Sequence, residues 1–189
     1  MNNFYPRTVA VVVIVGLCLT AYFANVLQQA WVGLLPFFEW LETTWFGVAG
    51  KTWGALFAVV EAFHLLAMAL MGGAILVSDG RLLGLVFTDY SADNVLARTH
   101  KLFVVALIAI VLTGIFMACG VALKIYYLPV YWFKMAALAM GVCFVFFIRR
   151  PLFKAGVENV NGILVKLMAI SSLMIWFTVA AAGRWIGFS

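Results

Sequence analysis

The chain has little charge and few of the residues that soluble enzymes use for catalysis. Only 10% of its 189 residues are Asp, Glu, Lys or Arg, and only two are histidines. Soluble domains carry about 25% charged residues, so this composition argues against a soluble enzyme. The net charge of +5 does not indicate nucleic-acid binding, because Lys and Arg mark the cytoplasmic loops of a membrane protein.

Cysteine is also scarce, and its spacing excludes a common kind of site. Cys18, Cys119 and Cys143 lie in apolar stretches, and no two of them have the CxxC spacing of a redox or zinc motif. We expect all three to be small buried hydrophobic residues.

Apolar residues make up 67% of the chain, and the mean hydropathy is +1.13. A transmembrane helix takes about 20 apolar residues, and five segments are long enough. We therefore predict an all-α, integral membrane five-helix bundle in the bacterial inner membrane, forming one domain over residues 1–189. The predicted spans are residues 8–27, 53–77, 95–122, 130–148 and 163–187.

The ends of these spans carry further signals. The first apolar stretch is longer than the roughly 7–15 residues of a signal-peptide core, so we expect an uncleaved span. Residues 31–46 are rich in tryptophan and read as an interfacial amphipathic segment, which we expect Pro36 to break. Ser91 or Asp93 is placed to cap the third span.

The basic residues predict the orientation. Eight fall on one side of the predicted spans and four on the other, so we expect a cytoplasmic N-terminus and a periplasmic C-terminus. The eight are Arg7, Arg81, Arg98, Lys101, Arg149, Arg150, Lys154 and Lys166, and the four are Lys51, Lys124, Lys134 and Arg184.

Two polar residues inside the second predicted span need a reason to be there, because ionisable groups are costly in hydrocarbon. Glu61 and His64 are one helical turn apart in EAFHLL, on a stripe with Met68 and Met71. We expect a cluster in which His64 and Glu61 meet two cations from later spans. Those cations are Lys134 and Arg184. A purely structural hydrogen-bond cluster, or a dimer through the small residues of 180–187, stays open.

Three uses of His64 compete. An imidazole can ligate haem iron, it can bind soft copper together with Met68 and Met71, or it can relay protons with Glu61. The other histidine, His100, is predicted about 15 Å away along the membrane normal, at 1.5 Å per residue. The two are therefore not expected to hold one haem. His100 is either an interfacial histidine or the ligand of a second haem.

Several motifs together resemble a family. EAFHLL, GGAILVSDGRLLG, LTGIF, YWFKM and AAAGRWIGF are similar to a group of bacterial membrane proteins related to the copper-resistance D-type proteins and to haem-binding membrane protoporphyrinogen oxidases. The resemblance covers roughly residues 50–189. It implies haem b on His64 with an important lysine at Lys134, or copper binding or transport instead.

We therefore expect a haem-b-binding membrane subunit for electron transfer or for anchoring a redox partner, rather than an independent enzyme. The alternatives are a cofactor-free accessory subunit and a copper-handling protein. Expected partners are membrane lipid, other membrane or periplasmic redox subunits or a second copy of the chain, and a quinone, with no nucleic acid.

Overall fold

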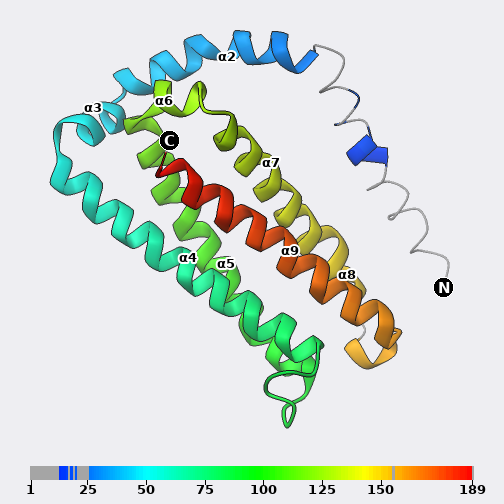
Figure 1. Ribbon diagram of the computed structural model, residues 1–189. Coiled ribbons are helices and arrows are strands. Elements are labelled where there is room, and N and C mark those ends of the chain that lie inside the picture. The colour runs from blue at the N-terminus through cyan, green and yellow to red at the C-terminus, as the bar shows by residue number, and fades with distance from the viewer. Residues whose placement is uncertain (1–12, 17, 19, 21–25, 155, 189) are drawn as a thin grey trace.

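The computed structural model describes residues 13–16, 18, 20, 26–154 and 156–188, and these contain helices and no strand. Four long helices form an elongated bundle (Figure 1). The elements are α2 (Val26–Thr43), α3 (Trp45–Thr52), α4 (Gly54–Leu82), α5 (Ala92–Gly120), α6 (Ala122–Tyr126), α7 (Pro129–Cys143), the π-helix η1 (Phe144–Arg149), α8 (Arg150–Leu152), the 3₁₀-helix η2 (Val157–Asn159) and α9 (Gly162–Ile186).

Four segments are long and apolar enough to cross a membrane: α4, α5, the continuous helical run of residues 129–152, and α9. These match four of the five predicted spans, so the structure has four helical segments that suit a multi-pass membrane protein. Of the span predicted at residues 8–27, the structure describes residues 13–16, 18 and 20, which are helical, and Val26 and Leu27, which begin α2.

The helix starts follow local capping chemistry. The Ser91 hydroxyl accepts a hydrogen bond from the Asn94 N–H at 3.3 Å and caps α5, while Asp93 accepts one from the Val157 N–H at 3.0 Å. Of the two predicted caps, Ser91 is therefore the one used. Proline begins α7, where its missing N–H costs nothing.

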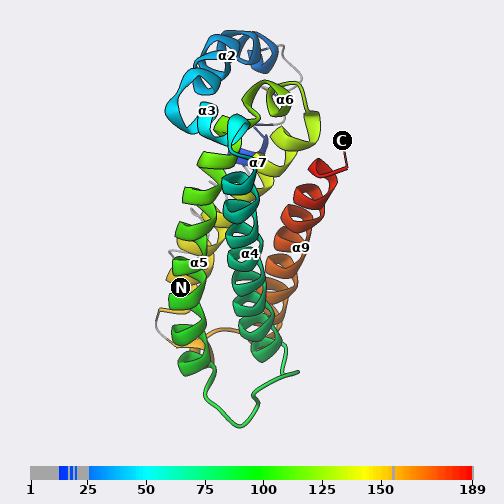
Figure 2. The same cartoon turned by 90° about the vertical axis from the view of Figure 1, so that its left-hand side faces the viewer.

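At one end of the bundle, α2, α3 and α6 form a layer that we call the platform, and the C-terminus lies at the same end (Figures 1 and 2). The loops after α4 and before α9 lie at the other end, here called the loop end. The interfacial segment predicted at residues 31–46 is thus helical, but the predicted break at Pro36 is wrong. Pro36 and Val32, whose carbonyl it leaves without a helical donor, are both exposed, so the helix tolerates the proline.

Reciprocal bonds hold the platform together. The Trp31 indole donates to the Tyr126 carbonyl at 3.3 Å, the Tyr126 hydroxyl donates to the Trp31 carbonyl at 2.8 Å, and the two rings stack at 5.1 Å. Glu42 accepts a bond from the Leu123 N–H of α6 at 2.9 Å and pairs with Lys51 of α3. These contacts connect all three platform helices.

Close backbone approach attaches the platform to the bundle. A Cβ atom on Gly50 of α3 would lie 2.9 Å from the Cα of Gly120, at the end of α5. Only glycine permits this approach, because the neighbouring atom is backbone and cannot rotate away.

The main hydrophobic core lies between α4, α5, η1 and α9, and a smaller one centred on Phe38 and Tyr126 lies under the platform. The prediction that the cysteines are buried holds for Cys119 and is wrong for Cys18 and Cys143, which are exposed. An apolar helix facing lipid exposes such residues at little cost.

Candidate functional site

His64 lies buried between α4 and α5, with only 7% of its surface exposed. Its Nδ1 atom is 2.8 Å from the hydroxyl oxygen of Thr113 on α5. A Cβ atom on the next residue, Gly114, would lie 3.4 Å from Cε1 of the imidazole. Threonine and glycine in LTGIF therefore hold the ring and leave space for it.

The hydrogen bonds around Thr113 favour one tautomer of His64. A threonine hydroxyl has one proton, and Thr113 donates it to the Ala109 carbonyl at 2.6 Å. The hydroxyl can then only accept from His64, so Nδ1 carries a proton. In the neutral ring Nε2 is therefore unprotonated, which is the form that can ligate a metal.

Lys134 of α7 is close enough to His64 to act on it electrostatically. It is partly buried, and a Cβ atom on Gly183 of α9 would lie 3.4 Å from its Cε and 3.5 Å from its Nζ. Within the described residues, no hydrogen bond or ion pair neutralises its ammonium group. The site thus combines a fixed imidazole with an unpaired cation.

Glu61 and Arg184, the other two members of the predicted cluster, lie elsewhere. Glu61 is exposed on α4 although it precedes His64 by only three residues. Arg184 is exposed as well, and its guanidinium lies 4.3 Å above the ring of Phe188. The structure therefore places Lys134 within electrostatic range of His64, but it does not form the four-residue cluster.

The methionines that were predicted to bind copper pack in or against the main hydrophobic core. Met71 is 6% exposed within the main core, and Met68 packs against that core. No group of three or more His, Cys, Asp or Glu side chains within the described residues is arranged to hold a metal ion.

His100 lies at a different height along the bundle axis from His64. It precedes Thr113 by thirteen residues on α5, which is about 20 Å of helix, so it lies far from His64. Its ring lies 6.4 Å from that of Phe103 and 5.8 Å from that of Phe146. The two histidines therefore do not share a site.

The sequence reasoning missed a buried polar centre near the loop end. Asp79 of α4 is fully buried, and its Oδ1 atom lies 2.7 Å from Nη2 of Arg149 in the π-helix η1. The same nitrogen donates to the Ser78 hydroxyl at 3.0 Å, and Ser172 of α9 lies beside the carboxylate. Asp79 was predicted to be in a link because SDG is typical of a turn.

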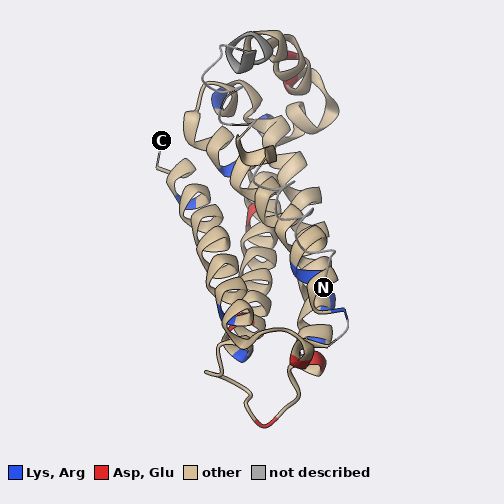
Figure 3. Ribbon diagram, turned by 90° about the vertical axis from the view of Figure 1, so that its right-hand side faces the viewer, with Lys and Arg blue, Asp and Glu red and all other residues tan. Residues whose placement is uncertain are grey.

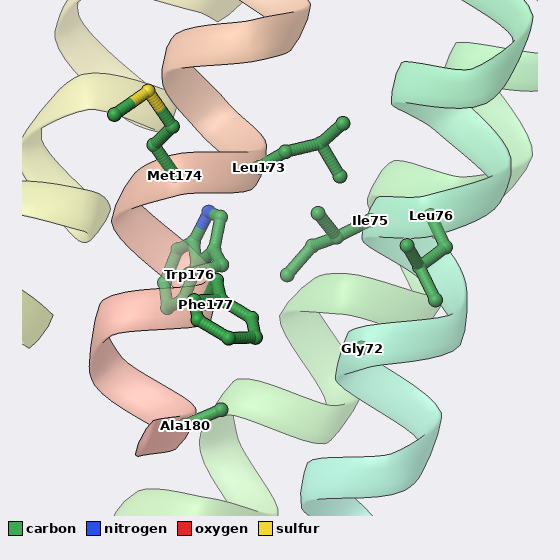
Figure 4. Close-up of a pocket in the computed structure, with 8 residues that line it drawn as sticks. All are labelled: Gly72, Ile75, Leu76, Leu173, Met174, Trp176, Phe177 and Ala180. Atoms are coloured by element: carbon green, nitrogen blue, oxygen red, sulfur yellow. The ribbon is translucent and has the colours of Figure 1, made fainter. Parts of the chain in front are cut away.

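A groove of about 430 Å³ lies between α4 and α9 (Figure 4). It lies near the middle of α9 and in the C-terminal half of α4, and no residue of the His64 site lines it. The lining residues are Gly72, Ile75, Leu76, Leu173, Met174, Trp176, Phe177 and Ala180.

One family of proteins matches this chain, over residues 37–189, and it is described as a family of unknown function, DUF6644. The chain belongs to this family. The match begins inside α2 and includes His64, Lys134 and all four long segments of the bundle. No curated protein and no solved structure matches this DUF6644 protein.

Proposed function

We propose that this DUF6644 protein is a haem-b-binding subunit of a redox complex in the bacterial inner membrane. It would transfer electrons or anchor a redox partner, in keeping with the predicted relation to copper-resistance D-type and haem-binding proteins. His64 would ligate the iron through Nε2. The observation that carries the proposal is the hydrogen bond from His64 Nδ1 to Thr113.

The donor chemistry at His64 fits a ligand that would hold haem iron. Ligating histidines almost always donate their other ring N–H to a fixed acceptor, which sets the tautomer. Thr113 is such an acceptor here, because its own proton goes to Ala109. Bound haem b would supply reversible one-electron chemistry.

Lys134 is the second residue that supports haem binding. Its unpaired ammonium favours an anionic group nearby, such as a haem propionate, because an isolated cation is costly in hydrocarbon. The same positive charge would favour the reduced, less positive state of a redox centre. Glu61 and Arg184 are exposed, so we leave them out of the proposed ligand shell.

We also propose the five-span topology, with residues 8–27 as the first span and the N-terminus cytoplasmic. Most of the cations predicted to be cytoplasmic lie at the loop end, on the far side of the bundle from the platform (Figure 3). That separation agrees with the positive-inside rule. Labelling a cysteine added after Ser189 from the periplasmic side tests the orientation, and protection of that cysteine would reverse it.

An absorption spectrum of the purified protein tests haem binding. We expect reducible Soret and α bands that disappear in His64→Ala and persist in His100→Ala, the matched control on α5. If the wild type has no such bands after haem supplementation, the proposal fails. Stoichiometric copper by elemental analysis would then favour copper handling.

The platform favours a second function, that of a cofactor-free accessory subunit. Two of its tryptophans are exposed, Trp40 at 57% and Trp45 at 65%. Tryptophan is enriched where proteins bind one another. Co-purification of a partner that is lost when both are changed to Ser, in a protein without haem or copper, would support this function.

A further inference from the structure

The groove between α4 and α9 lies where lipid chains lie. Its α9 residues, 173–180, surround the midpoint of Gly162–Ile186, so the groove is at the depth of hydrocarbon and not of headgroups. Its rim is open, because Leu76 is 64% and Phe177 is 74% exposed. A Cβ atom on Gly72 would meet nothing within 4 Å.

A cation lies on the same face of α9, nearer the loop end. Lys166, Leu173 and Ala180 are spaced by seven residues, which keeps them within about 20° per step on one side of a helix. Lys166 is exposed, and the described residues hold no ion-pair partner for it. It lies about 10 Å from Leu173 along the axis, at 1.5 Å per residue.

The spacing of cations on this face matches the bilayer. Arg184 is on the same face as Lys166 and follows it by eighteen residues, a rise of about 27 Å. A bilayer's hydrocarbon core is about 30 Å thick, so the two charges reach opposite headgroup layers. Arg184 already lies over Phe188, which leaves Lys166 as the free cation on this face of α9 in the described part of the chain.

We propose that the α4–α9 groove binds one acyl chain of an anionic phospholipid whose phosphate is held by Lys166. An isoprenoid quinone is a poorer fit, because the groove offers no accessible donor to its carbonyl groups. The one polar atom of the lining side chains, Nε1 of Trp176, is buried from solvent (Figure 4). Recognition of the ligand must therefore depend on its headgroup and on Lys166. This binding does not depend on haem.

Native mass spectrometry of the full chain in detergent tests the proposal, with phosphatidylglycerol and phosphatidylcholine as probes. Gly72→Leu fills the groove, and Gly73→Leu adds the same side chain at an exposed position outside it, where a Cβ atom also meets nothing within 4 Å. We expect Gly72→Leu to retain phosphatidylglycerol roughly tenfold less, as for two lost methylene contacts. Gly73→Leu should match the wild type.

The role of the Lys166 charge is tested by the same native mass spectrometry measurement. Lys166→Gln should weaken phosphatidylglycerol binding about fivefold, as for the loss of one lysine near an anionic lipid. It should weaken phosphatidylcholine binding less, because the choline cation offsets the charge of the same phosphate. Lys154→Gln, an exposed lysine at the same end, is the control and should have no such effect. Equal retention by Gly72→Leu and wild type would overturn the proposal, as would unchanged lipid preference in Lys166→Gln. A neutral isoprenoid or a second protein copy displaced by Gly72→Leu would also overturn it.

Discussion

The hydroxyl oxygen of Thr113 lies 2.8 Å from Nδ1 of His64 and 2.6 Å from the Ala109 carbonyl oxygen, so it accepts from the imidazole when its own proton is on Ala109. This arrangement leaves Nε2 of His64 as the only ring nitrogen able to ligate a metal. It also makes Thr113 the residue whose loss should most directly disturb the proposed haem site.

Replacing Thr113 with Val keeps its shape and removes the acceptor. We expect haem affinity to fall about 10–100-fold, the usual effect of losing the partner of a ligating histidine. Soret absorbance during haem titration measures it. Thr99→Val is the matched control, because the Thr99 hydroxyl bonds only to carbonyls of its own helix, at Val95 and Leu96. Equal losses in both variants would contradict the role of Thr113.

Removing one member of the buried Asp79–Arg149 pair should be strongly destabilising. Arg149→Met leaves the Asp79 carboxylate uncompensated, and we expect the free energy of unfolding to fall by about 3–5 kcal/mol. The double variant with Asp79→Leu should recover much of this loss, because no buried charge remains.

Denaturant unfolding in detergent measures both effects. Lys51→Met, at the more exposed Glu42 pair, provides the comparison and should cost no more than about 1 kcal/mol. A small effect of Arg149→Met would show that the pair is solvated.

Adding a methyl group at Gly50 should loosen the platform. Its Cβ atom would lie 2.9 Å from the Gly120 Cα, and such overpacking costs about 1–3 kcal/mol. At Gly54, where a Cβ atom meets nothing within 4 Å, Ala should be neutral or stabilising by up to about 1 kcal/mol. Thermal unfolding of both variants separates the steric effect from helix propensity, and equal melting temperatures would refute it.

The platform should also respond to acid through Glu42. Partial burial raises the pKa of this carboxyl, but the Lys51 ammonium and the Leu123 N–H outweigh it, so the pKa lies below its ordinary value of 4.5. The stabilisation is therefore complete above pH 4.5 and is lost as the pH falls through the lowered pKa.

Tryptophan fluorescence against pH, with Glu42→Gln beside the wild type, checks this response, because Trp31 lies in the platform. The wild type should show an acid transition below pH 4.5 that the Gln variant lacks. Identical profiles would mean that Glu42 does not contribute.

The spans were predictable from the sequence because about 20 consecutive apolar residues have few other stable arrangements. The ends of the spans were less predictable from the sequence. Asp79 was assigned to a link, since a turn signal in sequence does not reveal that Arg149 lies opposite and compensates the charge. Pro36 was expected to break the interfacial segment. The helix continues through it instead, because Pro36 and its neighbours are exposed.

The candidate site was predictable only in part. The sequence singled out His64 and Lys134, because polar residues in apolar runs are conspicuous. It did not reveal Thr113, whose hydroxyl becomes informative only when α5 is aligned against α4. Glu61 was predicted to share the cluster, but the rotation of α4 turns it outward, and a rotation of this kind is set by packing between helices.

The contact between Gly50 and Gly120 has a mechanical consequence. Two backbones in direct contact have no side chain to absorb a displacement, so we expect the platform and α5 to move together. Thr113 lies seven residues before Gly120 on α5, about 10 Å along the axis. We therefore expect a displacement of the platform to shift Thr113, the residue whose hydroxyl contacts the imidazole of His64.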